Sequence, residues 1–187
     1  MVTSELDARR LVFVDEMGTN TSLAPIYAWA PKGQRAYSKV PRNRGPNTTL
    51  LASITTEGMG PCIAVVGSIT RAAFEAYVQQ FLSAALEPGQ VVVMDNLLAH
   101  KGSRVRKLIE ARGCELLYLP PYSPDLNPIE EAFSKIKALL RRAGTRTRET
   151  LVEATGRALN AVTARDARSF FEHCGYHLPS QSPLQLL

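Results

Sequence analysis

The chain has 187 residues, 45% of them hydrophobic, and a formal net charge of +5. A chain of this length fits one domain that buries roughly 70% of its unfolded surface, so no disulfide or metal is needed as a staple. Its three cysteines are far apart, no run of about 18 apolar residues occurs, and the first residues lack a signal-peptide pattern. These features argue against a disulfide framework, a zinc site, a membrane span and secretion, and we expect a soluble, cytoplasmic protein.

The first half of the chain is predicted to form an antiparallel meander. Short runs of apolar and β-branched residues alternate with turns that contain glycine, proline or asparagine, which is the pattern of consecutive strands. The predicted strands cover residues 11–15, 26–31, 34–37, 48–55 and 62–66.

The second half alternates between strand and helix. From Arg71 onward apolar residues recur every three or four positions, which predicts a helix that ends at Pro88. The elements predicted next are a strand at 91–95, a helix at 103–112, a strand at 115–119, a long helix from 127 or 128 to about 142, and two helices capped by Thr147 and Thr163. This order predicts an α/β fold, with helices packed on a mixed sheet whose parallel strands end at one edge.

Three acidic residues lie where a predicted strand ends or a helix begins. Asp15 follows the apolar run 11–14, Asp95 follows the run 91–94, and Glu130 lies in the first turn of the long helix. Carboxylates at the rim of a hydrophobic core are costly unless they are paired, and two of them at neighbouring strand ends repel each other unless a divalent cation binds between them. Metal binding is therefore the first hypothesis.

The acidic residues near the long helix also have structural interpretations. Glu130 stands three residues after Asn127, a helix-capping arrangement in which the glutamate reaches back to the cap amide. Glu131 precedes Lys135 by four residues, which favours a surface ion pair, and on a helical wheel it points away from the apolar stripe that Glu130 flanks. Asp125 is most simply a turn residue. On these local patterns alone, a capping role for Glu130 stays open.

Three carboxylates that hold two magnesium ions have a recognisable chemistry. Paired ions activate the nucleophile and stabilise the leaving oxygen of a phosphodiester displacement, so no general-base side chain is required. His100 is close enough in sequence to Asp95 to contact substrate phosphate, and capping of the helix that begins near Ser103 is its alternative role. No nucleophile elbow, Walker loop or dinucleotide-binding glycine motif is present.

A basic segment covers residues 31–48 and contains no acidic residue. Its positive side chains, interleaved with proline, glycine, asparagine and Tyr37, suit a phosphate backbone. A solvated loop that serves only solubility is the alternative. The basic residues are Lys32, Arg35, Lys39, Arg42 and Arg44.

Three segments of the chain carry a resemblance to a known family. They read Phe-Val-Asp-Glu-Met-Gly-Thr-Asn-Thr-Ser at 13–22, Asp-Asn-Leu-Leu-Ala-His-Lys at 95–101, and Leu-Pro-Pro-Tyr-Ser-Pro-Asp-Leu-Asn-Pro-Ile-Glu-Glu-Ala-Phe-Ser-Lys-Ile-Lys at 119–137. Together they resemble the catalytic domain of mariner-superfamily DDE transposases, in the branch carried by bacterial insertion sequences. Positions 95 and 130 are 35 apart, which leaves 34 residues between the second and third acidic residues, as in that branch.

The resemblance implies a ribonuclease H-like fold with a mixed five-stranded sheet over residues 10–176, after a short lead-in at 1–9 and before a tail at 177–187. It implies that Asp15, Asp95 and Glu130 are catalytic and hold two Mg²⁺ ions, for which Mn²⁺ substitutes, and it selects Glu130 over Glu131. The reaction it implies is metal-dependent DNA cleavage at the ends of an insertion sequence, followed by strand transfer into target DNA.

The partner implied by the resemblance is DNA, held by a homodimer in the bacterial cytoplasm and nucleoid. Besides the basic segment, the residues expected to contact phosphate are His100, Lys101, Lys137, Arg141 and Arg142. Members of the family carry an amino-terminal helix-turn-helix region, for which the residues before the first strand leave no room. We therefore expect a separate helix-turn-helix polypeptide joined by frameshifting, an isolated catalytic portion, or the remnant of a decayed element.

Two other functions stay open. A ribonuclease H-like nuclease or resolvase would use the same metal site to cleave RNA–DNA hybrids or branched junctions without joining strands. An inactive remnant of a transposase would keep the fold and bind DNA without catalysis.

Overall fold

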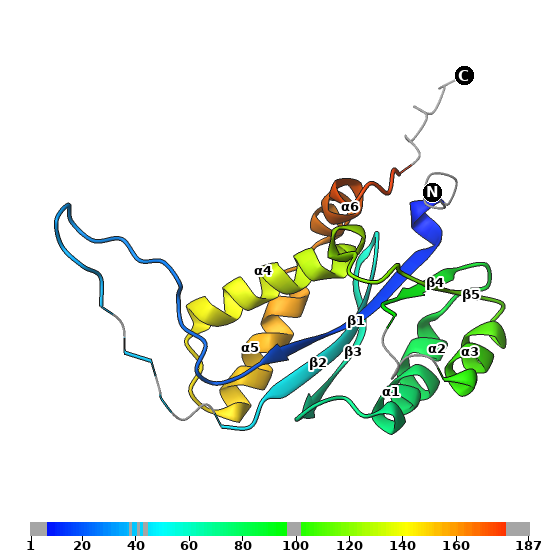
Figure 1. The fold of residues 1–187 in the computed structure, drawn as a ribbon, viewed down its shortest axis with the longest axis horizontal. Helices are drawn as coiled ribbons and strands as arrows, with labels where there is room; N and C mark the ends of the chain where they lie inside the picture. The colour runs from blue at the N-terminus through cyan, green and yellow to red at the C-terminus, as the bar shows by residue number, and fades with distance from the viewer. Residues whose placement is uncertain (1–6, 38, 41, 43–44, 97–101, 179–187) are drawn as a thin grey trace, which may run out of the picture.

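The structure, a computed structural model, describes residues 7–37, 39–40, 42, 45–96 and 102–178. A mixed sheet of five strands lies at its centre, in the order β3-β2-β1-β4-β5 (Figure 1). Strands β1 to β3 are antiparallel to one another, whereas β4 runs parallel to β1 and β5 runs parallel to β4. The strands are β1 (Leu11–Thr19), β2 (Thr48–Thr55), β3 (Gly58–Val66), β4 (Val91–Met94) and β5 (Glu115–Tyr118). The predicted parallel crossover and mixed five-stranded sheet are confirmed, and the antiparallel meander is confirmed for the predicted strands at 11–15, 48–55 and 62–66.

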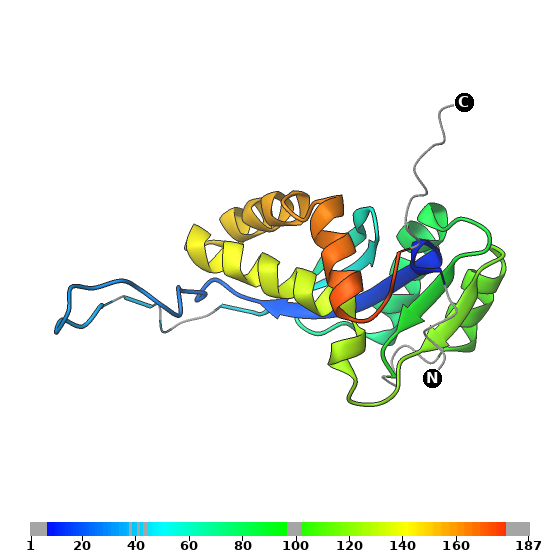
Figure 2. The same ribbon diagram turned by 90° about the horizontal axis from the view of Figure 1, so that it is seen from above.

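Helices cover both faces of this sheet (Figures 1 and 2). One face carries α4 (Pro128–Ala143), α5 (Arg148–Asn160) and α6 (Ala164–His173). The other face carries α1 (Arg71–Tyr77), the π-helical turn η2 (Val78–Leu82), α2 (Ser83–Ala85) and α3 (Ser103–Glu110). Two short 3₁₀ turns complete the order, η1 (Ala8–Arg10) and η3 (Pro124–Leu126). None of the helices in the described part of the chain is long and apolar enough to span a membrane.

The helix starts at α5 and α6 agree with the sequence pattern. Thr147 caps α5 and Thr163 caps α6, and each forms a capping box with the residue three positions later. Such caps satisfy backbone N–H groups that would otherwise have no partner at the first turn. The α4 helix ends at Gly144, which adopts the left-handed conformation that glycine accepts at little cost.

Two hydrophobic cores form because neighbouring residues of each central strand face opposite layers. Leu11 and Phe13 of β1 pack with α4, α5 and α6, whereas Val12 and Val14 pack with α1 and α3. All four are at most 3% exposed, as expected for a strand buried on both faces. Phe13 also lies 5.3 Å from Phe171 of α6, ring centre to ring centre, which ties that helix to the middle of the sheet.

The predicted strands at 26–31 and 34–37 are wrong. The described residues between 20 and 47 form no strand; they extend from the body of the molecule as an arm between β1 and β2 (Figure 1). Tyr27, Trp29 and Tyr37 on this arm are 90%, 103% and 90% exposed. An isolated two-stranded hairpin is marginal in water without a sheet or helix to cover its apolar face, which is the reason the alternating pattern fails here.

Candidate active site

The register of β1 and β4 places two acidic residues at neighbouring positions. The parallel ladder pairs Leu11–Val14 with Val91–Met94 and stops there, so Asp15 and Asp95 are the next residues on adjacent strands. Both follow in alternation from residues that face α4, namely Phe13 and Val93. The two carboxylates therefore point to the side of the sheet on which α4 begins.

Asp15 was predicted to end its strand, and the structure corrects this. Strand β1 continues to Thr19, because β2 pairs with it through Glu16–Thr19 after the pairing with β4 has stopped. Asp15 thus lies in the middle of strand β1. At this position β1 is still paired with β2 on one side, but its pairing with β4 on the other side has ended at Val14. Asp15 is 8% exposed, and it is the only buried charged residue among the residues that the structure describes.

Glu130 approaches the two aspartates from α4. It lies in the first turn of that helix, and together with Asp15 and Asp95 it lines a cavity of about 460 Å³. The remaining wall comes from the segment between β5 and α4, which contributes Leu119, Pro120, Pro121, Tyr122, Ser123, Pro124 and Asn127, with Asn96 beside Asp95. The three residues predicted to form the site are thus brought to one cavity, from strand β1, from the position directly after strand β4, and from helix α4.

The start of α4 differs from the predicted capping arrangement. Asn127 occupies the cap position, but its side chain makes no capping hydrogen bond. Its amide nitrogen Nδ2 instead donates to Oδ2 of Asp15 at 2.7 Å, while Oδ1 of Asp15 accepts from the backbone N–H of Glu16 at 2.7 Å. The capping interpretation of Glu130 is also wrong, because the backbone N–H of Asn127 donates to the carbonyl of Pro124 at 2.9 Å and not to the side chain of Glu130.

The predicted ion pair between Glu131 and Lys135 is also wrong. The ammonium of Lys135 donates to Oδ2 of Asp166 on α6 at 2.6 Å, and Glu131 is hydrogen-bonded to Nδ1 of His173, also on α6. Glu131 does not point away from the protein, since its side chain is only 33% exposed against that helix. The spacing of four residues permits a pair within α4, but α6 offers both side chains closer partners.

These contacts shift the pKa of two groups in physically expected directions. The hydrogen bond from Lys135, with further hydrogen bonds from Thr163, lowers the pKa of Asp166 to about 2. The hydrogen bond to Glu131 raises the pKa of His173, because the carboxylate stabilises the imidazolium form.

A second cavity, of about 370 Å³, lies between Asp125, Glu131 and His173 and shares Glu130 with the first one.

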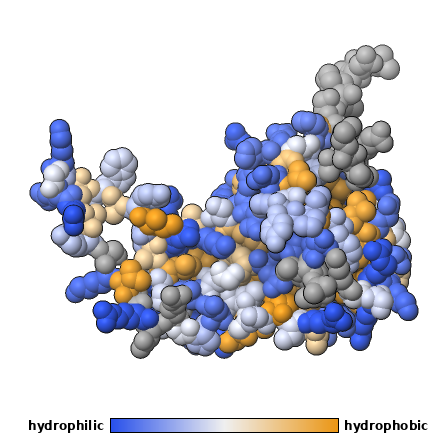
Figure 3. All heavy atoms as spheres, viewed as in Figure 1, coloured by the Kyte–Doolittle hydropathy of each residue, from blue (hydrophilic) through white to orange (hydrophobic). Residues whose placement is uncertain are grey.

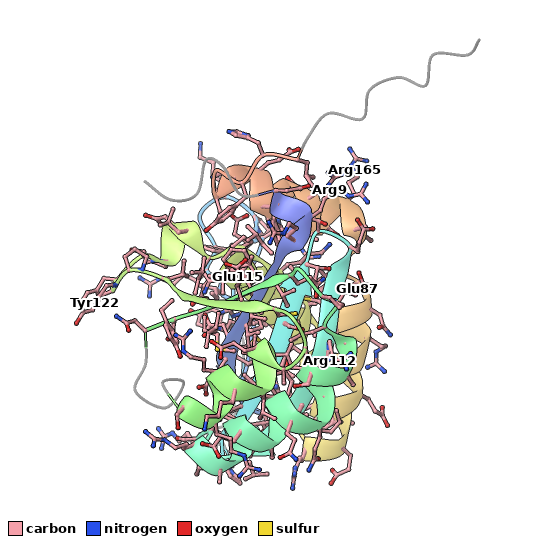
Figure 4. All side chains as sticks on the ribbon, turned by 90° about the vertical axis from the view of Figure 1, so that its right-hand side faces the viewer. Arg9, Glu87, Arg112, Glu115, Tyr122 and Arg165 are labelled. Carbon is pink, nitrogen blue, oxygen red and sulfur yellow. The ribbon has the colours of Figure 1, made fainter. Side chains whose placement is uncertain are left out.

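Tyr122 stands at the rim of the first cavity. It is fully exposed, at 102%, and has a φ of 57°, the only positive φ of a residue other than glycine in the described chain. Figure 4 shows its side chain projecting into solvent from the segment that follows β5. Left-handed backbone costs a residue with a side chain about 1 to 2 kcal/mol, so the site holds a bulky aromatic ring outward at an energetic cost. The sequence pattern gave no sign of this conformation.

The carboxylates offer the hard oxygen ligands that Mg²⁺ prefers. Within the described ranges, however, no group of three or more histidine, cysteine, aspartate or glutamate side chains is close enough to hold one ion together. An arrangement of two ions requires each ion to contact only some of the carboxylates. A buried acceptor beside the site supports the fit: Oδ1 of Asn127, a residue that lines the cavity, has no hydrogen-bond partner among the described residues.

The residues predicted to bind DNA fall into three groups. Lys32, Arg35, Lys39 and Arg42 are exposed on the arm, which Figure 3 shows as a protrusion with both hydrophilic and hydrophobic side chains. Lys137 and Arg141 lie one turn apart on α4 and are partly exposed, and Arg142 beside them is exposed. Arg44, His100 and Lys101 lie outside the described residues. Tyr27 and Trp29, which are also exposed on the arm, were assigned to a predicted strand and not to the basic segment.

The fold agrees with that of solved transposase structures. A Mos1 transposase paired-end complex with the left transposon end matches with a TM-score of 0.65 and 20% identity, over 90% of this chain and 56% of that chain. The Mos1 strand transfer complex gives 0.68 and 20%, over 90% and 52%, and the catalytic domain of Mos1 mariner transposase gives 0.57 and 16%, over 89% and 79%. The predicted ribonuclease H-like fold is confirmed, and the chain spans about half the length of the longer Mos1 chains.

The sequence itself identifies the family. The family model described as DDE superfamily endonuclease matches residues 10–152. The chain therefore belongs to the DDE superfamily endonucleases, as its motifs predicted. No curated protein matches the sequence.

Proposed function

We propose that this chain is the catalytic domain of a mariner-superfamily DDE transposase, of the branch found in bacterial insertion sequences, which cleaves and joins DNA strands with divalent metal ions. The observation that carries the proposal is the meeting of Asp15, Asp95 and Glu130 at one cavity, from three separate elements of the fold. The family membership and the fold support it.

In this proposal Asp15, Asp95 and Glu130 hold two Mg²⁺ ions, and Mn²⁺ substitutes for them. When bound, such a pair activates the nucleophile and stabilises the departing oxygen of a phosphodiester displacement. Glu130 is exposed, whereas Asp15 is buried and held by hydrogen bonds from Asn127 and from the backbone N–H of Glu16. Two related structures are described as Mos1 paired-end complexes with Mn and with Mg, which supports the choice of ions.

The proposed substrate is double-stranded DNA at the element ends and at the target. The basic side chains of the arm and of Lys137, Arg141 and Arg142 on α4 supply charge for phosphate contacts, which give affinity without sequence specificity. His100, Lys101 and Arg44 are proposed to join them. Recognition of the terminal repeats falls to a helix-turn-helix region on a separate or a longer polypeptide, and two copies of the chain are proposed to hold two DNA ends in the bacterial cytoplasm and nucleoid.

The first test is manganese-dependent nicking and strand joining on supercoiled plasmid DNA. The unmodified chain is compared with Glu130→Ala and with Glu131→Ala, a matched control because it removes the neighbouring carboxylate of the same helix. Loss of both nicking and joining in Glu130→Ala alone supports the proposal. Equal activity of Glu130→Ala and the unmodified chain contradicts it, and activity on RNA–DNA hybrids without strand joining favours the nuclease or resolvase.

Asp95→Ala gives a second, independent test. The substitution removes a proposed metal ligand and adds no charge that would repel phosphate, so we expect cleavage to be lost while DNA binding stays nearly unchanged. A variant that binds DNA much more weakly yet still cleaves in a metal-dependent way contradicts this assignment. A chain that binds DNA but cleaves none in any of these forms is an inactive remnant or needs its recognition partner.

A further inference from the structure

Asn127 occupies a helix cap position without capping the helix. The residue that follows it, Pro128, has no N–H to offer, and the N–H of Glu130 donates to the backbone carbonyl of Asn127 at 3.0 Å. A side-chain cap at this position is usually worth about 1 kcal/mol, as a loss on replacement by alanine. The fold does not use that contribution, because the side chain of Asn127 makes a different contact.

That contact is made to one of the proposed metal ligands, Asp15. The amide of Asn127, 4% exposed, donates to Oδ2 of Asp15 at 2.7 Å across 112 positions of sequence. The donor atom must face Asp15, because the opposite amide orientation would bring a carbonyl oxygen against a carboxylate. The same residue accepts the N–H of Glu130 through its backbone. Asn127 therefore links Asp15 on β1 to the turn of α4 that carries Glu130.

The segment before Asn127 is itself held in place. The backbone N–H of Asn127 donates to the carbonyl of Pro124 at 2.9 Å, and the hydroxyl of Tyr176 donates to the carbonyl of Leu126 at 2.8 Å. Because the backbone around Asn127 is already held, little conformational entropy is lost when its side-chain amide donates to Asp15. The hydrogen bond is therefore more effective than one formed by a side chain on a mobile segment. A hydrogen bond to a charged carboxylate is also among the shorter and stronger kinds.

We infer that Asn127 is a positioning residue, whose side-chain amide fixes the carboxylate of Asp15 and holds strand β1 against the first turn of α4. The inference rests on the proposed metal-dependent function, since the fixed carboxylate is a proposed metal ligand. Side chains that orient metal ligands typically change metal affinity or activity by about 10-fold to 100-fold when they are removed.

Two variants separate positioning from a purely structural role. Asn127→Ala removes the amide, and Asn127→Ser removes it but supplies a hydroxyl that is a good helix cap, so the second variant keeps the start of α4 stable. Ser123→Ala is the control, because Ser123 lines the same cavity and its hydroxyl donates to the carbonyl of Pro121. Binding of Mn²⁺ to the whole chain is measured by calorimetry or by electron paramagnetic resonance, and unfolding by urea is measured in parallel.

We expect Mn²⁺ to bind about 10-fold to 100-fold more weakly to both Asn127 variants and within about twofold of normal to Ser123→Ala, with Asn127→Ser still folded without urea and less destabilised than Asn127→Ala. Normal Mn²⁺ affinity in Asn127→Ser overturns the inference. If the unmodified chain itself binds no Mn²⁺, it is the proposed function that fails, and a metal-free measurement then decides on Asn127.

The metal-free measurement is the exchange of the Asn127 side-chain amide protons with water, followed by nuclear magnetic resonance. In the unmodified chain we expect slow exchange, because the amide is buried and bound to a carboxylate. In Asp15→Ala we expect faster exchange and a shifted signal. The same exchange rate and chemical shift in both chains would overturn the inference whatever the metal data show.

Discussion

His173 near the end of α6 is hydrogen-bonded through Nδ1 to Oε1 of Glu131 on α4, the residue directly after Glu130. The pair thus joins the helix that carries a proposed catalytic residue to the helix that packs beside it. Glu131 and Glu130 both line the second cavity, whereas of the two only Glu130 lines the first. Two consecutive glutamates of one helix therefore have different partners.

The pair predicts a small dependence of stability on pH. Glu131, with Asp125 nearby, raises the pKa of His173 above its ordinary value of 6.5. Such a group stabilises the fold fully below pH 6.5, and its contribution is lost as pH rises through the raised pKa. We expect the unmodified chain to melt at a higher temperature than His173→Gln below pH 6.5 and at the same temperature near pH 9, by differential scanning calorimetry. An equal difference at both pH values would show that charge on His173 contributes nothing.

The position of the two aspartates could be predicted from sequence, because each follows a strand-like apolar run and parallel strands end at one edge of a sheet. The full length of β1 could not, since residues 16–19 carry no apolar run and are held in the strand by pairing with β2. On the arm the error is the opposite one, because strands were predicted where the described residues form none. An alternating pattern predicts strands, but the pattern carries no information on whether a neighbouring strand is there to pair with it.

The contact of Asn127 with Asp15 illustrates what local patterns miss. An asparagine before proline at a helix start, followed by glutamate three residues later, fits a capping motif by every local criterion. The side chain finds a charged partner 112 positions away that no local pattern names. Glu131 and Lys135 behave in the same way, because α6 offers each of them a partner outside α4. At this site tertiary contacts override helix-local preferences.

The contact between Lys135 and Asp166 is expected to stabilise the packing of α6 on α4. Asp166 also closes the capping box of α6, so Asp166→Ala should lower the free energy of unfolding by about 1 to 2 kcal/mol, measured with urea at pH 7. Because the pKa of Asp166 is lowered from 3.8 to about 2, its contribution is present above pH 3.8 and lost as pH falls through about 2. Asp166→Asn, which keeps a hydrogen-bonding side chain, should be less destabilised, and equal stability of all three chains at pH 7 would refute the role.

Replacement of Tyr122 by glycine is predicted to change stability and DNA binding in opposite directions. Its left-handed backbone is costly for tyrosine, so Tyr122→Gly should raise the free energy of unfolding by up to about 1 kcal/mol. An exposed aromatic ring at the rim of the cavity can stack on a nucleic-acid base, which is worth about 1 to 3 kcal/mol. We therefore expect Tyr122→Gly and Tyr122→Ala to bind DNA about 5-fold to 150-fold more weakly, by fluorescence anisotropy, while Tyr122→Phe binds normally. Normal binding by Tyr122→Ala would rule out stacking.

The basic residues of the arm are expected to set the salt dependence of DNA binding. Removing one positive side chain that neutralises a phosphate reduces the slope of log K against log salt concentration by about 0.9. Replacing Lys32, Arg35 and Lys39 by glutamine should therefore weaken binding and flatten that slope. The matched control removes the same charge from Arg104, Arg106 and Lys107, which belong to α3 at the end of the molecule opposite the arm (Figure 1). Because counterions are released only where phosphates are contacted, a flatter slope in the arm variant alone assigns the arm to DNA, whereas an unchanged slope assigns its charge to solubility.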